Sequence, residues 1–181
     1  MNDRQQIDGH LVFVGLPGSG KSTVGRAVAR ELGRPFFDFD AEIERRTGRS
    51  VARVFAELGE VEFRAMEVDL TRELAAAPPM VLAPGGGWVT NPGVMALLRP
   101  PGRIIHLRLR PAKALRRLSR SRVVRPLLQV ADPAAAMQAL WEARADLYAA
   151  ADYEVDVEAV DSQALTENLV ALAHERTPEI G

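Results

Sequence analysis

With 181 residues and a formal net charge of −1, the chain is large enough for one domain with a substantial core and too neutral for bulk binding to nucleic acid or a membrane surface. It has no cysteine, which excludes disulfides, zinc–thiolate sites and a cysteine nucleophile. No apolar run approaches the roughly 20 residues of a membrane span, and the first six residues are polar rather than a signal peptide, so we expect a cytoplasmic protein.

The first predicted strand, Leu11–Val14, leads into a glycine-rich loop. Residues 15–22 read Gly-Leu-Pro-Gly-Ser-Gly-Lys-Ser, which is the full G-x-x-x-x-G-K-[ST] phosphate-binding pattern. The glycines let backbone N–H groups point at phosphate oxygens, and a helix that begins near Lys21 adds the positive end of its dipole. Lys21 would reach the β- and γ-phosphates, and the Ser22 hydroxyl would bind Mg²⁺. A chance glycine-rich turn is disfavoured, because strand, loop and helix follow in the order that the motif requires.

Two aspartates end the second predicted strand, Pro35–Phe39. Side chains alternate across a strand, so Asp38 and Asp40 should share one face. They would lie at the C-terminal end of a parallel strand, where such sheets bind ligands. One would serve the metal and the other a substrate hydroxyl. The alternative is that Asp40 only caps the helix that follows.

A helical insertion beside the sheet is expected over residues 40–65. Ser50 should cap a helix over Val51–Leu58. Arg64 lies at the end of the insertion, and Glu67, three residues further on, could hold its guanidinium in place. The alternative for a single helical arginine is an ordinary surface salt bridge.

Three glycines, Gly85, Gly86 and Gly87, follow the third predicted strand, Met80–Ala83. Consecutive glycines cost backbone entropy, so a plain turn would not need them. They allow a ligand to approach the main chain and expose N–H donors to it. A hairpin turn is the alternative, and the alternation of strands and helices argues against it. Pro92 should begin a helix that includes Val94–Leu98.

A basic stretch of weak periodicity, residues 119–130, follows the fourth predicted strand, Ile104–Leu109. It reads as a mobile loop. Arg125 lies within it, and a flexible arginine that folds over a triphosphate would neutralise the charge that develops in phosphoryl transfer. A generic basic loop remains the alternative for any one arginine, because others are close by: Arg116, Arg117, Arg120 and Arg122.

The remaining elements are a helix, a strand and a helix. Asp132 and Pro133 should open a long helix that carries Arg144 and ends near Ala150. A fifth strand, Tyr153–Val157, and a last helix from Ser162 to about Arg176 complete the chain, with residues 177–181 frayed. Strands that alternate with helices predict a single α/β domain with a parallel sheet.

Together these motifs resemble the shikimate kinases, a family with the nucleoside-monophosphate-kinase-like P-loop fold. The resemblance rests on the phosphate-binding loop followed by Phe-Phe-Asp-Phe-Asp-x-x-Ile-Glu, Phe-Arg-x-x-Glu, Gly-Gly-Gly, Arg-Pro-Leu-Leu, and Arg144 four residues before Tyr148. It implies a three-layer P-loop kinase fold with helices on both faces of a five-stranded parallel sheet in the order 2-3-1-4-5, a substrate-binding insertion and a lid loop. In the family, ATP phosphorylates the 3-hydroxyl of shikimate in aromatic amino-acid biosynthesis.

The resemblance also implies a role for each site residue. ATP would bind to Gly18, Ser19, Gly20, Lys21, Ser22, Thr23, Arg117 and Arg125. Its Mg²⁺ ion would bind to Ser22 directly and to Asp38 through water. The shikimate carboxylate would meet Arg64 and Arg144, and its hydroxyls would meet Asp40 and the loop Gly85, Gly86 and Gly87. The catalytic residues would be Lys21, Asp40 and Arg125, the last of them in the lid.

The chain departs from the family pattern at two places near the nucleotide. The position seven residues before Arg125 is Leu118 rather than arginine, with Arg117 and Arg120 beside it. The segment after the last strand, residues 158–161, is acidic rather than basic. We expect a monomeric kinase of shikimate. The alternatives are a P-loop kinase of another small hydroxy acid, such as gluconate, and a nucleotide-dependent binding module.

Overall fold

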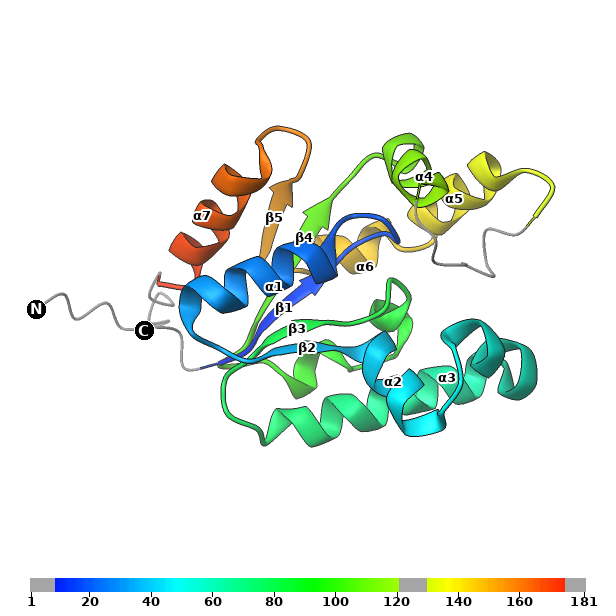
Figure 1. Ribbon diagram of the computed structural model, residues 1–181, viewed down its shortest axis with the longest axis horizontal. Coiled ribbons are helices and arrows are strands. Elements are labelled where there is room, and N and C mark those ends of the chain that lie inside the picture. The colour runs from blue at the N-terminus through cyan, green and yellow to red at the C-terminus, as the bar shows by residue number, and fades with distance from the viewer. Residues whose placement is uncertain (1–8, 121–129, 175–181) are drawn as a thin grey trace, which may run out of the picture.

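The computed structural model describes residues 9–120 and 130–174, and its centre is one parallel sheet (Figure 1). The five strands lie in the order β2-β3-β1-β4-β5, which confirms the predicted order. Their bounds lie within one residue of the predicted ones: β1 Leu11–Val14, β2 Phe36–Asp38, β3 Val81–Ala83, β4 Arg103–Arg108 and β5 Tyr153–Asp156.

Helices cover both faces of this sheet. In the view of Figure 1, α1 crosses in front of the strands and packs against α7, while α6 lies behind them. The helices are α1 Lys21–Leu32, α2 Phe39–Thr47, α3 Val51–Ala75, α4 Pro111–Ser119, α5 Pro133–Glu142, α6 Ala145–Ala149 and α7 Ser162–Leu172. One 3₁₀ turn, η1 Trp88–Thr90, lies before Pro92, and a second, η2 Met95–Leu97, stands where a helix was predicted after Pro92. Within the described ranges, no helix is long and apolar enough to cross a membrane.

The helix that follows the phosphate-binding loop, α1, packs closely on the sheet. Val24, Val28 and Leu32 recur at helical spacing and are buried against the sheet. A Cβ atom at Gly25 would lie 2.6 Å from the ring of Phe36, so only glycine lets α1 pack this close to β2. The start of α1 is thereby fixed relative to the strand ends, where the candidate site lies.

The second strand ends one residue earlier than predicted, and this changes the roles of the two aspartates. Asp38 is the last residue of β2 and the cap of α2, since its carboxylate accepts the Ala41 N–H at 3.2 Å. Asp40 lies in the first turn of α2. The prediction that both share a strand face was therefore wrong, and the cap is Asp38 rather than Asp40.

The other differences from the prediction concern where helices begin and end. Ser50 caps α3 as predicted, but the helix runs through a kink at Gly59, where φ is +83°, and reaches Ala75. The helix that Asp132 opens ends at Glu142 rather than Ala150, and α6 is separate. The last helix, α7, begins at Ser162 as predicted, with Asp161 as its cap, but it ends at Leu172 rather than near Arg176. The predicted lid begins inside α4, and its residues 121–129, like the predicted frayed tail, lie outside the described residues.

Candidate active site

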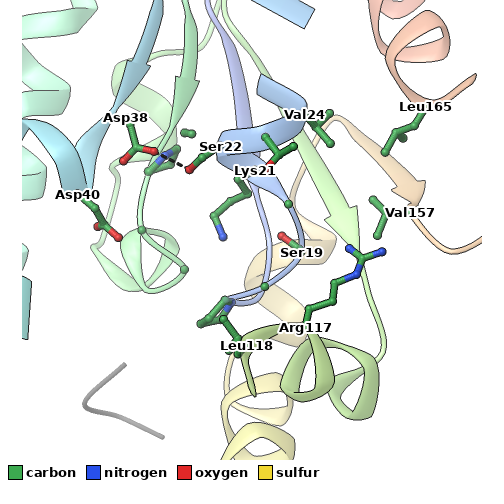
Figure 2. A pocket seen from close by; sticks show the side chains of 18 of the residues that line it. Ser19, Lys21, Ser22, Val24, Asp38, Asp40, Arg117, Leu118, Val157 and Leu165 are labelled. Carbon is green, nitrogen blue, oxygen red and sulfur yellow. Dashed lines mark hydrogen bonds between the residues drawn. The ribbon is translucent and has the colours of Figure 1, made fainter. Parts of the chain in front are cut away.

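A cavity of about 570 Å³ lies where the strands end (Figure 2). It brings together most of the site residues predicted from the sequence. They are Gly18, Ser19, Gly20, Lys21, Ser22, Thr23, Asp38, Asp40, Gly85, Gly86 and Arg117. Segments that are up to about a hundred residues apart in the chain thus meet at one edge of the sheet, as ligand sites of parallel sheets do.

The phosphate-binding loop holds its own lysine through backbone carbonyl groups. Lys21 donates from Nζ to the carbonyl oxygens of Gly15 at 2.9 Å and Leu16 at 3.1 Å. Gly20 has a φ of +97° and precedes α1, so the loop turns into the helix in a left-handed conformation. The Ser19 hydroxyl is buried and has no hydrogen-bond partner within the described ranges. A loop of this shape, with a lysine and an orphaned hydroxyl at a helix N-terminus, fits the phosphates of a nucleotide.

Ser22 and Asp38 form the side of the cavity next to the loop. The Ser22 hydroxyl donates to Asp38 Oδ2 at 2.5 Å, the dashed line in Figure 2. In the described part of the chain, no cluster of three or more histidine, cysteine or carboxylate residues offers a complete metal cage. The pair nonetheless fits Mg²⁺, because that ion keeps several waters and takes one or two protein oxygens beside the phosphates of a nucleotide.

Asp40 and the Gly85–Gly87 loop face each other across the next part of the site. A Cβ atom at Gly85 would lie 2.8 Å from Glu67 Oε1 and 3.2 Å from Asp40 Oδ1. A Cβ atom at Gly87 would lie 2.1 Å from Arg64 Nη2. The sequence predicted that glycines at these positions let a ligand approach the main chain. The structure gives a second reason for glycine, because three charged side chains of the protein lie where a larger side chain would be.

Arg64 is fixed by the glutamate that its helical spacing predicted. Arg64 Nη1 donates to Glu67 Oε2 at 2.7 Å, and Nη2 donates to Glu60 Oε1 at 2.9 Å. The Arg64 side chain is 13% exposed and Glu67 is fully buried, so this is not the exposed salt bridge that was the alternative. The guanidinium has one fixed orientation, over Gly87.

Glu67 is a buried carboxyl group beside another carboxylate. Burial raises its pKa from 4.5 to about 7, and the charge of Asp40 adds to the rise, while Arg64 and a hydrogen bond from Asn91 oppose it. Its Oε1 atom has no partner among the described residues. The sequence marked Glu67 as a partner of Arg64, but nothing local in it indicated the buried position or the raised pKa.

Arg144 is buried too, at a place that the sequence did not predict. It lies in the break between α5 and α6, immediately before α6, and is 5% exposed. Its guanidinium lies close enough to the Tyr148 hydroxyl to lower the pKa of that group, as does Arg64, although burial dominates and raises this pKa to about 12. Arg64 and Arg144, the two arginines predicted to bind one carboxylate, therefore both lie near the Tyr148 hydroxyl.

Tyr148 connects these two arginines to the glycine loop, and the sequence analysis predicted no role for it. Its hydroxyl donates to the Gly86 carbonyl at 2.8 Å. The ring of His106 stacks on its ring with centroids 4.7 Å apart, and His106 Nδ1 pairs with Glu154 Oε2 at 3.0 Å. Burial lowers the pKa of His106, so at neutral pH the ring is a neutral support for Tyr148. The four-residue spacing from Arg144 was the only signal in the sequence.

Arg117 and Leu118 line the cavity on the side of α4 (Figure 2). Arg117 Nη1 lies 4.0 Å from the point that a Cβ atom at Gly20 would occupy, so its charge is beside the phosphate-binding loop. Arg120 follows the end of α4 and does not line the cavity. Arg125 lies outside the described residues, and its role stays a prediction.

Comparison with known proteins gives a consistent answer. The family model described as "Shikimate kinase" matches residues 17–173. A shikimate kinase from Burkholderia pseudomallei (strain 1710b) is 47% identical over 139 residues, which are 77% of this chain and 75% of that protein. One from Mycobacterium tuberculosis (strain ATCC 25177 / H37Ra) is 48% identical over 137 residues, 76% of this chain and 77% of that protein.

The fold gives the same result as the sequences. A shikimate kinase from Acinetobacter baumannii, solved in complex with shikimate, superposes with a TM-score of 0.86 and is 35% identical. The match covers 92% of this chain and 93% of that one. The family model, the relatives and the fold together confirm the resemblance seen in the motifs: the chain belongs to the shikimate kinase family.

Proposed function

We propose that the protein transfers the γ-phosphoryl group of ATP to the 3-hydroxyl of shikimate. The observation that supports this most directly is that Arg64 and Arg144 both lie close to the Tyr148 hydroxyl, at the glycine loop that Asp40 also lies against, next to a complete phosphate-binding loop. A substrate with one carboxylate and several hydroxyls matches that donor set, because guanidinium groups pair with carboxylates and Asp40 accepts from hydroxyls.

On the nucleotide side, the protein supplies position and positive charge. Lys21 and the N-terminus of α1 stabilise the negative charge on the β- and γ-phosphates. Ser22, with Asp38 behind it, is where Mg²⁺ would bind, and the ion when bound would neutralise charge on the phosphate oxygens. We propose that Arg125 adds a further cation to the transferring group.

On the acceptor side, Arg64 and Arg144 hold the carboxylate, so that the hydroxyl faces Asp40. Asp40 accepts the hydroxyl proton while the hydroxyl oxygen bonds to the γ-phosphorus. The bond between that phosphorus and the bridging oxygen breaks, and the electron pair leaves with ADP. The glycine loop and Tyr148 keep the acceptor at a fixed distance from the phosphates.

Shikimate-dependent release of ADP, measured in a coupled assay, tests this function. Wild-type protein should turn over ATP with shikimate and not with gluconate. Lys21→Ala should abolish the reaction without unfolding the protein, because Lys21 lines the cavity, where its side chain donates to loop carbonyl oxygens. Equal turnover with gluconate, or substantial ADP release by a folded Lys21→Ala protein, would overturn the proposal.

The two alternatives are weaker. A kinase of another hydroxy acid such as gluconate is not favoured, because the family model and the similar relatives are shikimate kinases. A nucleotide-dependent binding module would not need Asp40, Arg64 and Arg144 to converge. We further propose that the chain is one catalytic domain, with a substrate-binding insertion over residues 40–65, which acts as a cytoplasmic monomer. Light scattering on the purified protein tests the monomer.

A further inference from the structure

Strands β4 and β5 carry a row of paired polar side chains along one edge of the sheet. Residues from β4 onward pair with carboxylates 48 positions later: His106 with Glu154 by a hydrogen bond, and Arg108 with Asp156 and Arg110 with Glu158 by ion pairs. The pairs recur at every second residue, so they share one face. Only the third pair lies beyond the strands, next to the candidate nucleotide site.

Glu158 is held more closely than Glu154, the first carboxylate of the row. It accepts from the Arg110 backbone N–H at 2.9 Å, from Arg110 Nη2 at 2.6 Å, and pairs with Lys113 Nζ at 3.0 Å. Its side chain is 10% exposed, whereas that of Glu154 is 51% exposed. The hydrogen bonds from Arg110 hold the pKa of Glu158 well below its usual range, so the group stays ionised.

These contacts join two elements on opposite sides of the cavity. Arg110 immediately precedes α4, so the carboxylate lies at the positive end of that helix. The last turn of α4 carries Arg117 and Leu118 into the cavity. On the other side, Glu158 directly follows Val157, which lines the facing wall together with Leu165. Figure 2 shows the Arg117 guanidinium pointing toward Val157 across this gap.

The acidic segment after β5 therefore does not face the nucleotide as a repulsive charge. Glu158 is turned onto Arg110 and Lys113, and Asp161 accepts the N–H groups of Gln163 and Ala164 at the start of α7. Both carboxylates therefore have partners within the protein. The cavity keeps a cationic wall at Arg117 and an apolar wall at Val157 and Leu165, which suits the flat, neutral base of a nucleoside.

We infer that Glu158 is a positioning residue for the nucleoside part of the nucleotide: by fixing the start of α4 to the segment after β5, it sets the separation of the two walls. This rests on the proposed nucleotide site. Glu158 itself does not line the cavity, and it acts through Arg117 and Val157, which do. It should therefore affect binding of the base much more than binding at the phosphate loop.

Two probes distinguish these effects: ADP, and inorganic tripolyphosphate, which has no base. Calorimetry should show that Glu158→Ala weakens ADP binding about tenfold and leaves tripolyphosphate binding within about twofold of wild type, since a displaced wall removes preorganised contact with the base alone. KM for ATP should rise while KM for shikimate and kcat stay unchanged. Glu158→Gln keeps an acceptor for the Arg110 N–H, so it should weaken ADP binding less than Glu158→Ala does and again leave tripolyphosphate binding nearly unchanged. This variant tests the inference even if the alanine variant does not fold.

Glu57→Ala is the matched control. Glu57 is also held by two cations, Arg53 at 2.7 Å and Arg49 at 2.8 Å, but it lies on α3 away from the cavity. It should leave ADP binding unchanged. Unaltered ADP affinity in the Glu158 variants, or equal losses for ADP and tripolyphosphate, would overturn the inference. Because ADP binding needs no turnover, failure of wild-type protein to phosphorylate shikimate would be a separate result.

Discussion

Replacing Glu67 with glutamine should stabilise the protein at alkaline pH and change its stability little at acidic pH. Glu67 is fully buried, and burial raises its pKa from 4.5 to about 7. This shift is a net value that already includes the attraction of Arg64. The folded protein therefore prefers the neutral carboxyl group, and ionisation of Glu67 above its folded-state pKa works against folding.

The sign and size follow from proton linkage. Below 4.5 both the folded and the unfolded states hold the proton, so the neutral group imposes no penalty. Between 4.5 and about 7 the unfolded state releases the proton and the folded state keeps it, so stability falls as pH rises. The loss is complete above the folded-state pKa and amounts to about 3 kcal/mol. Glutamine cannot ionise and escapes this loss, while its carbonyl oxygen still accepts from Arg64.

Urea denaturation of wild type and Glu67→Gln at about pH 5 and about pH 8.5 measures the effect, and the difference between the two proteins should change by about 2.5 kcal/mol between these conditions. Glu73→Gln on the same helix is the control. A hydrogen bond from Arg46 lowers the pKa of Glu73, so this variant should lose stability at alkaline pH instead. A Glu67→Gln difference that is the same at both pH values would refute the reasoning, because Glu67 would then be ionised throughout.

Three further predictions concern the acceptor side. Asp40→Asn should keep nucleotide binding and lose about 10²–10⁴ in kcat, because an amide is a poor proton acceptor; turnover within a few-fold of wild type would leave Asp40 without a role as base. Arg64→Leu and Arg144→Leu should each weaken shikimate binding about ten- to hundredfold by calorimetry and leave ADP binding unchanged, since each removes a charge-assisted hydrogen bond. A loss confined to ADP would assign that arginine to the nucleotide. Gly87→Ala should raise KM for shikimate as strongly as Arg64→Leu does, because its Cβ atom would lie 2.1 Å from the guanidinium; an unchanged KM would show that Arg64 can bind from another position.

The features that the sequence predicts well are those whose cause is local. The phosphate-binding loop needs particular residue types at fixed spacing, and α1, Lys21 and Ser22 lie where the motif requires. The strand order follows from the resemblance, and the Arg64–Glu67 pair follows from helical spacing.

Most of the errors occur where distant parts of the chain decide the local structure, and the end of β2 is the exception, because a local cap decides it. Alternating residues suggested that the strand continues through Phe39, but capping by Asp38 starts α2 there instead. No proline or glycine marks the break that places Arg144 before α6. The Tyr148 contact with Gly86 spans 62 residues, and no local pattern encodes it. Burial of Glu67 likewise depends on the packing of several elements.

The crowding around the glycine loop has a consequence for inhibitors. At Gly85 and Gly87 any larger side chain would enter space that Glu67, Asp40 and Arg64 already occupy. A substitution there that excludes a drug would also displace the groups proposed to bind the natural substrate. An inhibitor that takes its hydrogen bonds from the main chain of residues 85–87 would therefore leave few resistance mutations open. An inhibitor that depends on the exposed side chain of Arg117 would leave many more resistance mutations open.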